Sequence, residues 1–203
     1  MRQFKFFIDF EKEEQWLSDM AKKGYVFAGK AFSYEFKASE PEEAVIKIDY
    51  RQFKSQADFG DYVALFEDSG WLHVAGSKYS GTQYFKKAGD QSSNDIFSDV
   101  DSKAGRYQRW SQMWFTLACC YIPIFAAMVS TGLVDATAFI DPKALYYTPG
   151  LWEKTGASFW QAFLFETPFA LGRGFSWLLF PLLIALYLLF SAMAKRRYRR
   201  IQS

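Results

Sequence analysis

The sequence contains very little of the chemistry on which most metalloproteins and many enzymes depend. Its 203 residues include two cysteines and one histidine. The cysteines, Cys119 and Cys120, are adjacent, so they supply neither a disulfide framework nor a structural zinc site. His73, without a second histidine or a neighbouring cysteine, is a poor metal ligand, and we interpret it as a structural or surface residue. We therefore predict no metal, no cofactor and no enzymatic activity.

Two other patterns that often carry chemistry have simpler explanations here. Glu11, Glu13 and Glu14 are neighbours in sequence rather than convergent, and negative charge is favourable in the first turn of a helix. Gly172 and Gly174 do not have the spacing of a phosphate-binding loop. We expect the three glutamates to begin a helix rather than to act as a general acid and base.

Charge is distributed unevenly along the chain, although the net charge is only +2. Residues 1–105 contain 14 Lys and Arg against 18 Asp and Glu, whereas residues 106–203 contain 10 against 4. Half of the residues are hydrophobic and 20% are aromatic, which excludes a disordered chain. An acidic domain repels a phosphate backbone, so we predict no nucleic-acid partner and interpret the basic C-terminus as the flank of a membrane segment.

Two uncharged runs are long enough to cross a bilayer, which requires about 20 helical residues. They are residues 110–134 and 174–194, and each contains a proline that we expect to kink the helix. We predict two transmembrane helices with the lipid bilayer as a partner; two buried helices of a soluble bundle are the alternative. The aromatic segment inside the loop 135–173 is too short and too interrupted to span, which favours an interfacial or re-entrant piece.

Basic residues next to these runs predict the orientation, because positive residues are retained on the cytoplasmic side. The residues that we predict to flank the membrane are Arg106, Arg109, Lys195, Arg196, Arg197, Arg199 and Arg200. The basic tail is residues 195–203, and acidic residues interrupt the N-terminus too early for a signal peptide. We predict a multi-pass protein of the cell membrane with cytoplasmic N- and C-termini and an extracytoplasmic loop.

The first half of the chain shows one pattern twice. In each copy an alternating strand, at residues 4–10 and 44–50, precedes a helix that ends at a glycine, Gly24 or Gly70. Two shorter strands follow each helix. A pattern that recurs in the same order indicates a duplicated structural unit.

These elements define the predicted architecture. The fold class is α+β: residues 1–89 form a duplicated β-α-β-β domain with one antiparallel sheet of about six strands, followed by a two-helix transmembrane hairpin. Ser55 and Asp58 have the spacing of a capping box at the start of the second helix. The polar residues 90–109 predict a tether between the domain and the membrane.

The order and spacing of four motifs resemble a known family. The motifs are FFIDFEKEEQWLSDMAKKGY, IDYRQFK, YVALFEDSGW and QYFKK. They are similar to an uncharacterised bacterial family with a "domain of unknown function", over about residues 3–105. The resemblance implies a cytoplasmic N-terminal domain, often followed by membrane spans and often encoded beside a PadR-like transcriptional regulator. It implies no catalytic residues.

Aromatic residues of the first half exceed what a core of this size requires. Most of them are explained by packing and sheet pairing, and the remainder are candidates for a groove that binds a hydrophobic or cationic compound. The candidate groove residues are Tyr25, Tyr34, Tyr50, Trp71 and Tyr84.

From these features we predict a non-enzymatic integral membrane protein. Its cytoplasmic domain acts in regulation or protein interaction, with a protein partner that the sequence does not identify. Two alternatives stay open: a sensor of a small hydrophobic or cationic compound, and an accessory subunit of an export or envelope-stress system. An exposed apolar patch favours the first hypothesis, and a concave tyrosine-lined pocket favours the sensor.

Overall fold

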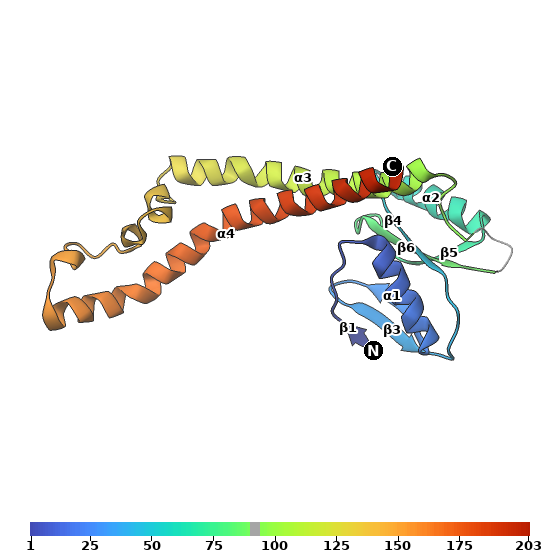
Figure 1. Ribbon diagram of the computed structural model, residues 1–203, viewed down its shortest axis with the longest axis horizontal. Coiled ribbons are helices and arrows are strands. Elements are labelled where there is room, and N and C mark those ends of the chain that lie inside the picture. Colours follow the sequence, from blue (N-terminus) through green and yellow to red (C-terminus); the bar gives the residue numbers. More distant parts are fainter. Residues whose placement is uncertain (90–93) are drawn as a thin grey trace. The chain divides into compact units, whose positions relative to one another are not determined.

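The computed structural model describes residues 1–89 and 94–203 of the chain. It is an α+β structure, with two small antiparallel sheets in its first half and two long apolar helices in its second half (Figure 1). Two compact units are present. The first combines residues 1–112 with residues 191–203, and the second consists of residues 113–190.

The first sheet has three strands in the order β1-β3-β2. The elements of this part are β1 (Arg2–Gln3), α1 (Phe10–Lys22), β2 (Tyr25–Lys30) and β3 (Tyr34–Ala38). Helix α1 begins after Asp9, whose side chain accepts a hydrogen bond from the backbone N–H of Glu11 at 3.1 Å. It ends before Gly24, which has a φ of +80° and turns the chain into β2, as predicted.

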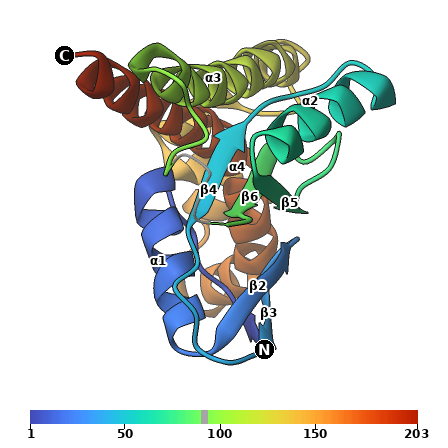
Figure 2. The ribbon, with the colours of Figure 1, turned by 90° about the vertical axis from the view of Figure 1, so that its right-hand side faces the viewer.

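The second sheet repeats this arrangement, with β4, β6 and β5 side by side in that order (Figure 2). Its elements are β4 (Ile46–Tyr50), α2 (Gln56–Asp68), β5 (Trp71–Ala75) and β6 (Thr82–Lys87). The predicted cap of α2 is confirmed, since Ser55 Oγ accepts a hydrogen bond from the N–H of Asp58 at 3.0 Å. Gly70, at a φ of +81°, ends this helix as Gly24 ends α1.

Two predictions for this half are wrong. Residues 4–10 do not form a strand, because β1 ends at Gln3 and Asp9 caps a helix that starts at Phe10. The six strands also do not form one sheet. Hydrogen bonds join strands only within each group of three, which gives two three-stranded sheets.

The predicted tether is helical over its second half. Its residues 90–93 lie outside the described residues, and helix α3 begins at Val100 and ends at Ser130. Ala104, Arg106 and Tyr107 are fully buried in the first unit. Together with Trp110 they follow the spacing of one helix face, so this face packs like a core helix in spite of its polar composition.

The long C-terminal helix, α4 (Gly156–Gln202), begins well before the second uncharged run. The segment predicted to be interfacial is therefore part of this helix. Glu166 forms an ion pair with Arg173 and accepts hydrogen bonds from the Tyr147 N–H at 3.2 Å and the Thr148 hydroxyl at 3.0 Å. The one charged residue inside the aromatic segment, Glu166, is thus paired within the second unit.

Three short 3₁₀ helices precede α4 in the second unit. They are Ala136–Phe139, Pro142–Leu145 and Leu151–Glu153. Among the described residues, α3 and α4 are the helices long and apolar enough to cross a membrane. Only 6% and 17% of their most apolar windows are buried inside the protein, whereas the core helix of a soluble protein is mostly buried.

Candidate functional site

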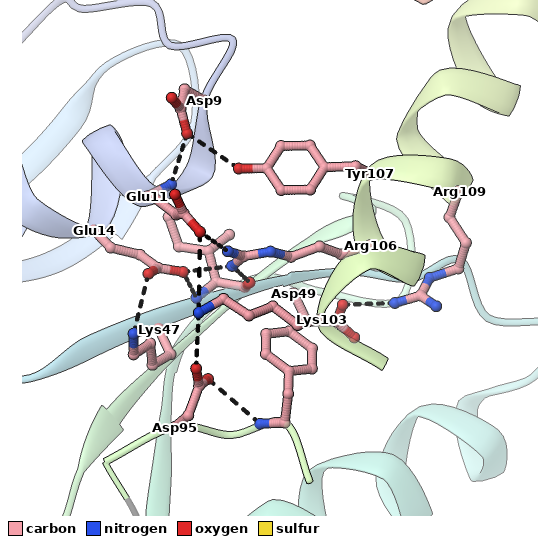
Figure 3. Close-up of polar contacts among 12 residues, drawn as sticks. Asp9, Glu11, Glu14, Lys47, Asp49, Asp95, Lys103, Arg106, Tyr107 and Arg109 are labelled. Atoms are coloured by element: carbon pink, nitrogen blue, oxygen red, sulfur yellow. Dashed lines mark hydrogen bonds and ion pairs between the residues drawn. The ribbon is translucent and has the colours of Figure 1, made fainter. Parts of the chain in front are cut away.

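Charged and phenolic side chains, all but one of them buried, gather where α1, β4 and the start of α3 meet (Figure 3). The carboxylates come from α1 and β4, and the arginines come from α3. We call this cluster the junction. Its members are Asp9, Glu14, Asp49, Arg106, Tyr107 and Arg109.

Arg106 is the centre of the junction and is 0% exposed. Its Nη1 donates hydrogen bonds to Glu14 Oε1 at 2.5 Å and to the Ile48 carbonyl at 2.6 Å. Its Nε and Nη2 have no hydrogen-bond partner among the described residues. Three aromatic rings have their centres 5.1–5.3 Å from the guanidinium carbon: Phe10, Phe97 and Tyr107. The ion pair and these ring faces offset part of the large cost of removing a guanidinium from water.

Glu14 contacts β4 as well as α3. Its Oε1 accepts a hydrogen bond from the Ile48 N–H at 3.1 Å, and its Oε2 lies 3.4 Å from Lys47 Nζ. Strand β4 is at the edge of its sheet, where outward N–H and C=O groups lack a neighbouring strand. Glu14 and Arg106 supply the missing partners for both backbone groups of Ile48.

Arg109 donates a hydrogen bond to the same open edge of β4, two residues after Ile48. Its Nε donates to the Tyr50 carbonyl at 2.5 Å, and its Nη2 donates to Asp49 Oδ1 at 2.7 Å. The other oxygen of Asp49 accepts a hydrogen bond from the Tyr62 hydroxyl at 2.8 Å. One buried carboxylate therefore links β4 to both α2 and α3 (Figure 3 shows the contact with Arg109).

Asp9 connects three helices of the first unit. It caps α1 and accepts a hydrogen bond from the Tyr107 hydroxyl of α3 at 3.1 Å. It also forms an ion pair with Arg197, in the part of α4 that belongs to this unit. The start of α3 and the end of α4 are thus bound to the same carboxylate.

Another buried carboxylate, Glu13, joins the two sheets. Its Oε1 accepts hydrogen bonds at 2.6 Å from the hydroxyls of Tyr34 in β3 and Tyr84 in β6, and it lies 2.9 Å from Lys30 Nζ. Burial, and then the charge of Glu13 and the hydrogen bonds to it, raise the pKa of both tyrosines well above the ordinary value. Both phenols therefore stay neutral donors over the physiological pH range.

Four of the five candidate groove residues lie in the core. Tyr34, Tyr50, Trp71 and Tyr84 are between 1% and 5% exposed, and Tyr25 is half-buried. They do not line an accessible groove. The sequence analysis assigned most of the aromatic rings to the core, and for these residues that is correct. Tyr34 and Tyr84 bind Glu13 through their hydroxyls. Trp71 packs in a cluster with Phe53, Tyr62 and Phe85.

The basic residues predicted to flank the membrane divide into two groups. Arg106, Arg109 and Arg197 bind carboxylates of the first unit, as described above. The exposed ones are Lys195, Arg196, Arg199 and Arg200. Arg106 shares a helix face with Tyr107 and Trp110, but no local sequence pattern identifies the carboxylates that these arginines bind.

The interpretation of the glutamates is correct in part. Glu11 and Glu13 lie in the first turn of α1, but Glu13 and Glu14 are buried and bind partners from other elements. His73 Nε2 lies 3.0 Å from Gln83 Oε1, a structural contact between β5 and β6. Within residues 1–89 and 94–203, no three His, Cys, Asp or Glu side chains are grouped so that they could hold a metal ion.

One comparison with known proteins gives a match. The family model described as "Protein of unknown function (DUF2812)" matches residues 9–119, more than half of the chain. The matched range includes α1, the second sheet and the junction residues of α3. No curated protein and no solved structure matches the chain significantly.

The raised tyrosine pKa values predict how stability depends on pH. A neutral phenol is favoured in the folded state, so its contribution is complete below pH 10 and is lost as the pH rises above 10.0, where tyrosines of the unfolded chain ionise. We expect that, for a fragment of residues 1–112, the denaturant concentration at the midpoint of unfolding decreases once the pH exceeds about 10. Phenolate absorbance of Tyr34 and Tyr84 should appear only together with unfolding.

The control is the double variant Tyr34→Phe/Tyr84→Phe, in which the decrease of the midpoint with pH should be shallower. If both tyrosines of the wild-type fragment ionise near pH 10 while it stays folded, the buried hydrogen bonds to Glu13 are not formed in solution.

Proposed function

Because the chain belongs to the DUF2812 family of proteins of unknown function, we propose a role that follows from its architecture. It is a non-enzymatic membrane protein whose folded domain holds the first helix of a membrane hairpin and acts in regulation or protein interaction. The observation that carries this proposal is the course of α3. The same helix supplies the buried Arg106 of the junction and, from Met113 on, an apolar segment of the second unit.

The contacts of the C-terminal segment support a hairpin with both ends on one side of the membrane. Residues 191–203 belong to the same compact unit as the domain. Besides the ion pair of Arg197 with Asp9, the Ser111 hydroxyl donates to the Ser191 carbonyl at 2.9 Å, and Gln202 donates to Asp101 at 2.9 Å. A chain that leaves and returns to one unit crosses a bilayer an even number of times.

The exposed basic residues support a cytoplasmic location of this unit. Lys195, Arg196, Arg199 and Arg200 follow directly after the apolar part of α4, and positive residues near a span are retained in the cytoplasm. The loop 135–173 then lies outside. In line with the family resemblance, we place the protein in a bacterial cell membrane and infer that its two β-α-β-β units arose by duplication, since both have the same strand order.

Exposed aromatic residues support a protein partner for the domain. Phe32, in the turn between β2 and β3, is 98% exposed, and Tyr79, in the turn between β5 and β6, is 87% exposed. The two positions are equivalent in the two units. Aromatic side chains are enriched among the residues that contribute most to protein interfaces. The sensor alternative has less support, because the tyrosines predicted to line its groove lie in the core.

The membrane part of this proposal predicts a pattern of cysteine labelling. In a Cys119→Ala/Cys120→Ala background, Lys154→Cys should react with an impermeant thiol reagent added to intact cells, because it is an exposed residue of the outer loop. Ser39→Cys and Ser203→Cys, both exposed in the first unit, should react only after the cells are opened. The reverse pattern would contradict the orientation, and labelling of position 154 alone from inside would contradict the hairpin.

The interaction part predicts where a partner makes contact. A photo-reactive amino acid placed at position 32 or 79 of the full chain, in membranes of the organism that makes it, should yield one discrete adduct on irradiation. The matched control is position 37, exposed on β3 in the same sheet as the Phe32 turn. Equal adducts at all three positions, or an adduct at position 37 alone, would contradict a partner at the two turns.

A further inference from the structure

A groove in the first unit lies between the beginning of α1 and the end of α4. Two adjoining cavities of about 580 and 290 Å³ form it. The residues that line both cavities are Phe7, Asp9, Lys12 and Arg197. We call it the α1–α4 groove. It does not contain any of the five tyrosine and tryptophan residues predicted as a ligand site.

Two lysines in the wall of this groove have no carboxylate partner. Among the ion pairs of residues 1–89 and 94–203, none involves Lys5 or Lys12. Lys5 Nζ lies 4.9 Å from the ring centres of Phe7 and Trp16, so the wall holds this cation by aromatic faces alone. Unpaired cations inside a concave surface favour an anionic ligand.

The acidic residues of the groove balance the basic residues of the larger cavity in number, but not those of the smaller one. Asp9 is bound by Arg197, by the Tyr107 hydroxyl and by the N–H of Glu11. Glu11 lies 3.9 Å from Lys103 Nζ. Asp19 lines only the larger cavity. The smaller cavity, with Lys12 and Arg197 against Asp9, therefore has an excess of positive charge.

The rest of the smaller cavity is apolar. Phe6, Phe7, Ile8 and Met193 form its wall, and Phe6 is 64% exposed. Phe4, two residues earlier, is 81% exposed. Cations beside exposed aromatic rings are typical of protein surfaces that meet the interface of a bilayer. The groove thus combines the features that bind a charged headgroup with those that bind a hydrocarbon chain.

The position of the groove along α4 fits this chemistry. Met193 and Arg197 are one helical turn apart, and the apolar run ends at Ala194. With a rise of about 1.5 Å per residue, Arg197 lies about 5 Å beyond the end of that run. In a helix that spans a bilayer, this is the depth of the lipid headgroups.

We propose that the α1–α4 groove binds one anionic phospholipid of the bilayer. Its phosphate contacts Lys5, Lys12 and Arg197, and an acyl chain lies against Phe6 and Met193. This inference rests on the proposed function, because it requires α4 to span the membrane. It gives the domain a lipid ligand at the place where α1, α3 and α4 are joined through Asp9.

The test uses the full chain in lipid nanodiscs made of phosphatidylcholine with a small fraction of phosphatidylglycerol. After release into mild detergent, native mass spectrometry counts the lipids that stay bound. We expect one phosphatidylglycerol molecule to stay bound to each wild-type chain and no phosphatidylcholine to stay bound. In Lys5→Gln/Lys12→Gln the apparent affinity for phosphatidylglycerol should fall about tenfold or more, since each basic residue near the surface strengthens such binding several-fold.

The matched control is Lys23→Gln/Lys37→Gln, which removes the same charge from two exposed lysines outside the groove. Its affinity should equal that of the wild type. If both double variants lose the same affinity for phosphatidylglycerol, the lipid is attracted by net charge alone, and the proposed site is wrong. Retention of phosphatidylcholine to the same degree, or displacement of phosphatidylglycerol by millimolar inorganic phosphate, would also overturn it.

Failure of this inference is distinguishable from failure of the proposed function. A chain that enters nanodiscs and resists carbonate extraction, yet retains no phosphatidylglycerol selectively, is a membrane protein without this site. A chain that does not enter nanodiscs contradicts the membrane function, and the lipid site with it.

Discussion

The buried ion pair between Arg106 and Glu14 is the interaction on which the arrangement of the first unit depends. It joins α3 to α1, and both side chains also bind the backbone of Ile48, at the open edge of the second sheet. Removing these charges from water is expensive, so the loss of one partner of the pair is strongly destabilising. The pair therefore favours the packing of α3 against α1 and β4 over its separation from them.

Helix α1 and its N-cap carry three carboxylates that bind α3, α4 and strands of both sheets. Asp9 binds α3 and α4, Glu13 binds one tyrosine from each sheet, and Glu14 binds α3 and β4. Two small three-stranded sheets are thereby joined within one compact unit. A ligand or partner that moves α1 changes the contacts of both helices that we propose to enter the membrane.

Much of this fold follows from local sequence patterns, and the main differences have one physical cause. Both helices of the domain, their glycine ends and the Ser55 cap depend on neighbours in sequence, so they were predictable. The strand predicted at residues 4–10 is absent although Phe4, Phe6 and Ile8 alternate, because β1 ends at Gln3 and Asp9 caps helix α1. Pairing over long distances in sequence, such as Glu14 with Arg106, has no local signature. For that reason the sequence predicts membrane-flanking arginines and a polar tether where the structure has a helix that packs against the domain.

The central claim is that Arg106 and Glu14 form a buried pair that anchors α3, and a double-mutant cycle on a fragment of residues 1–112 tests it most directly. Arg106→Met alone should lower the free energy of unfolding by about 3–5 kcal/mol, because it leaves Glu14 buried with only the more distant Lys47, at 3.4 Å, as a cation. Adding Glu14→Met should recover a large part of that loss. The exposed pair of Arg2 with Glu35, at 2.7 Å, is the control, and Arg2→Met should cost less than about 1 kcal/mol. Additive losses from Arg106→Met and Glu14→Met, or an effect of Arg106→Met as small as that of Arg2→Met, would contradict the account.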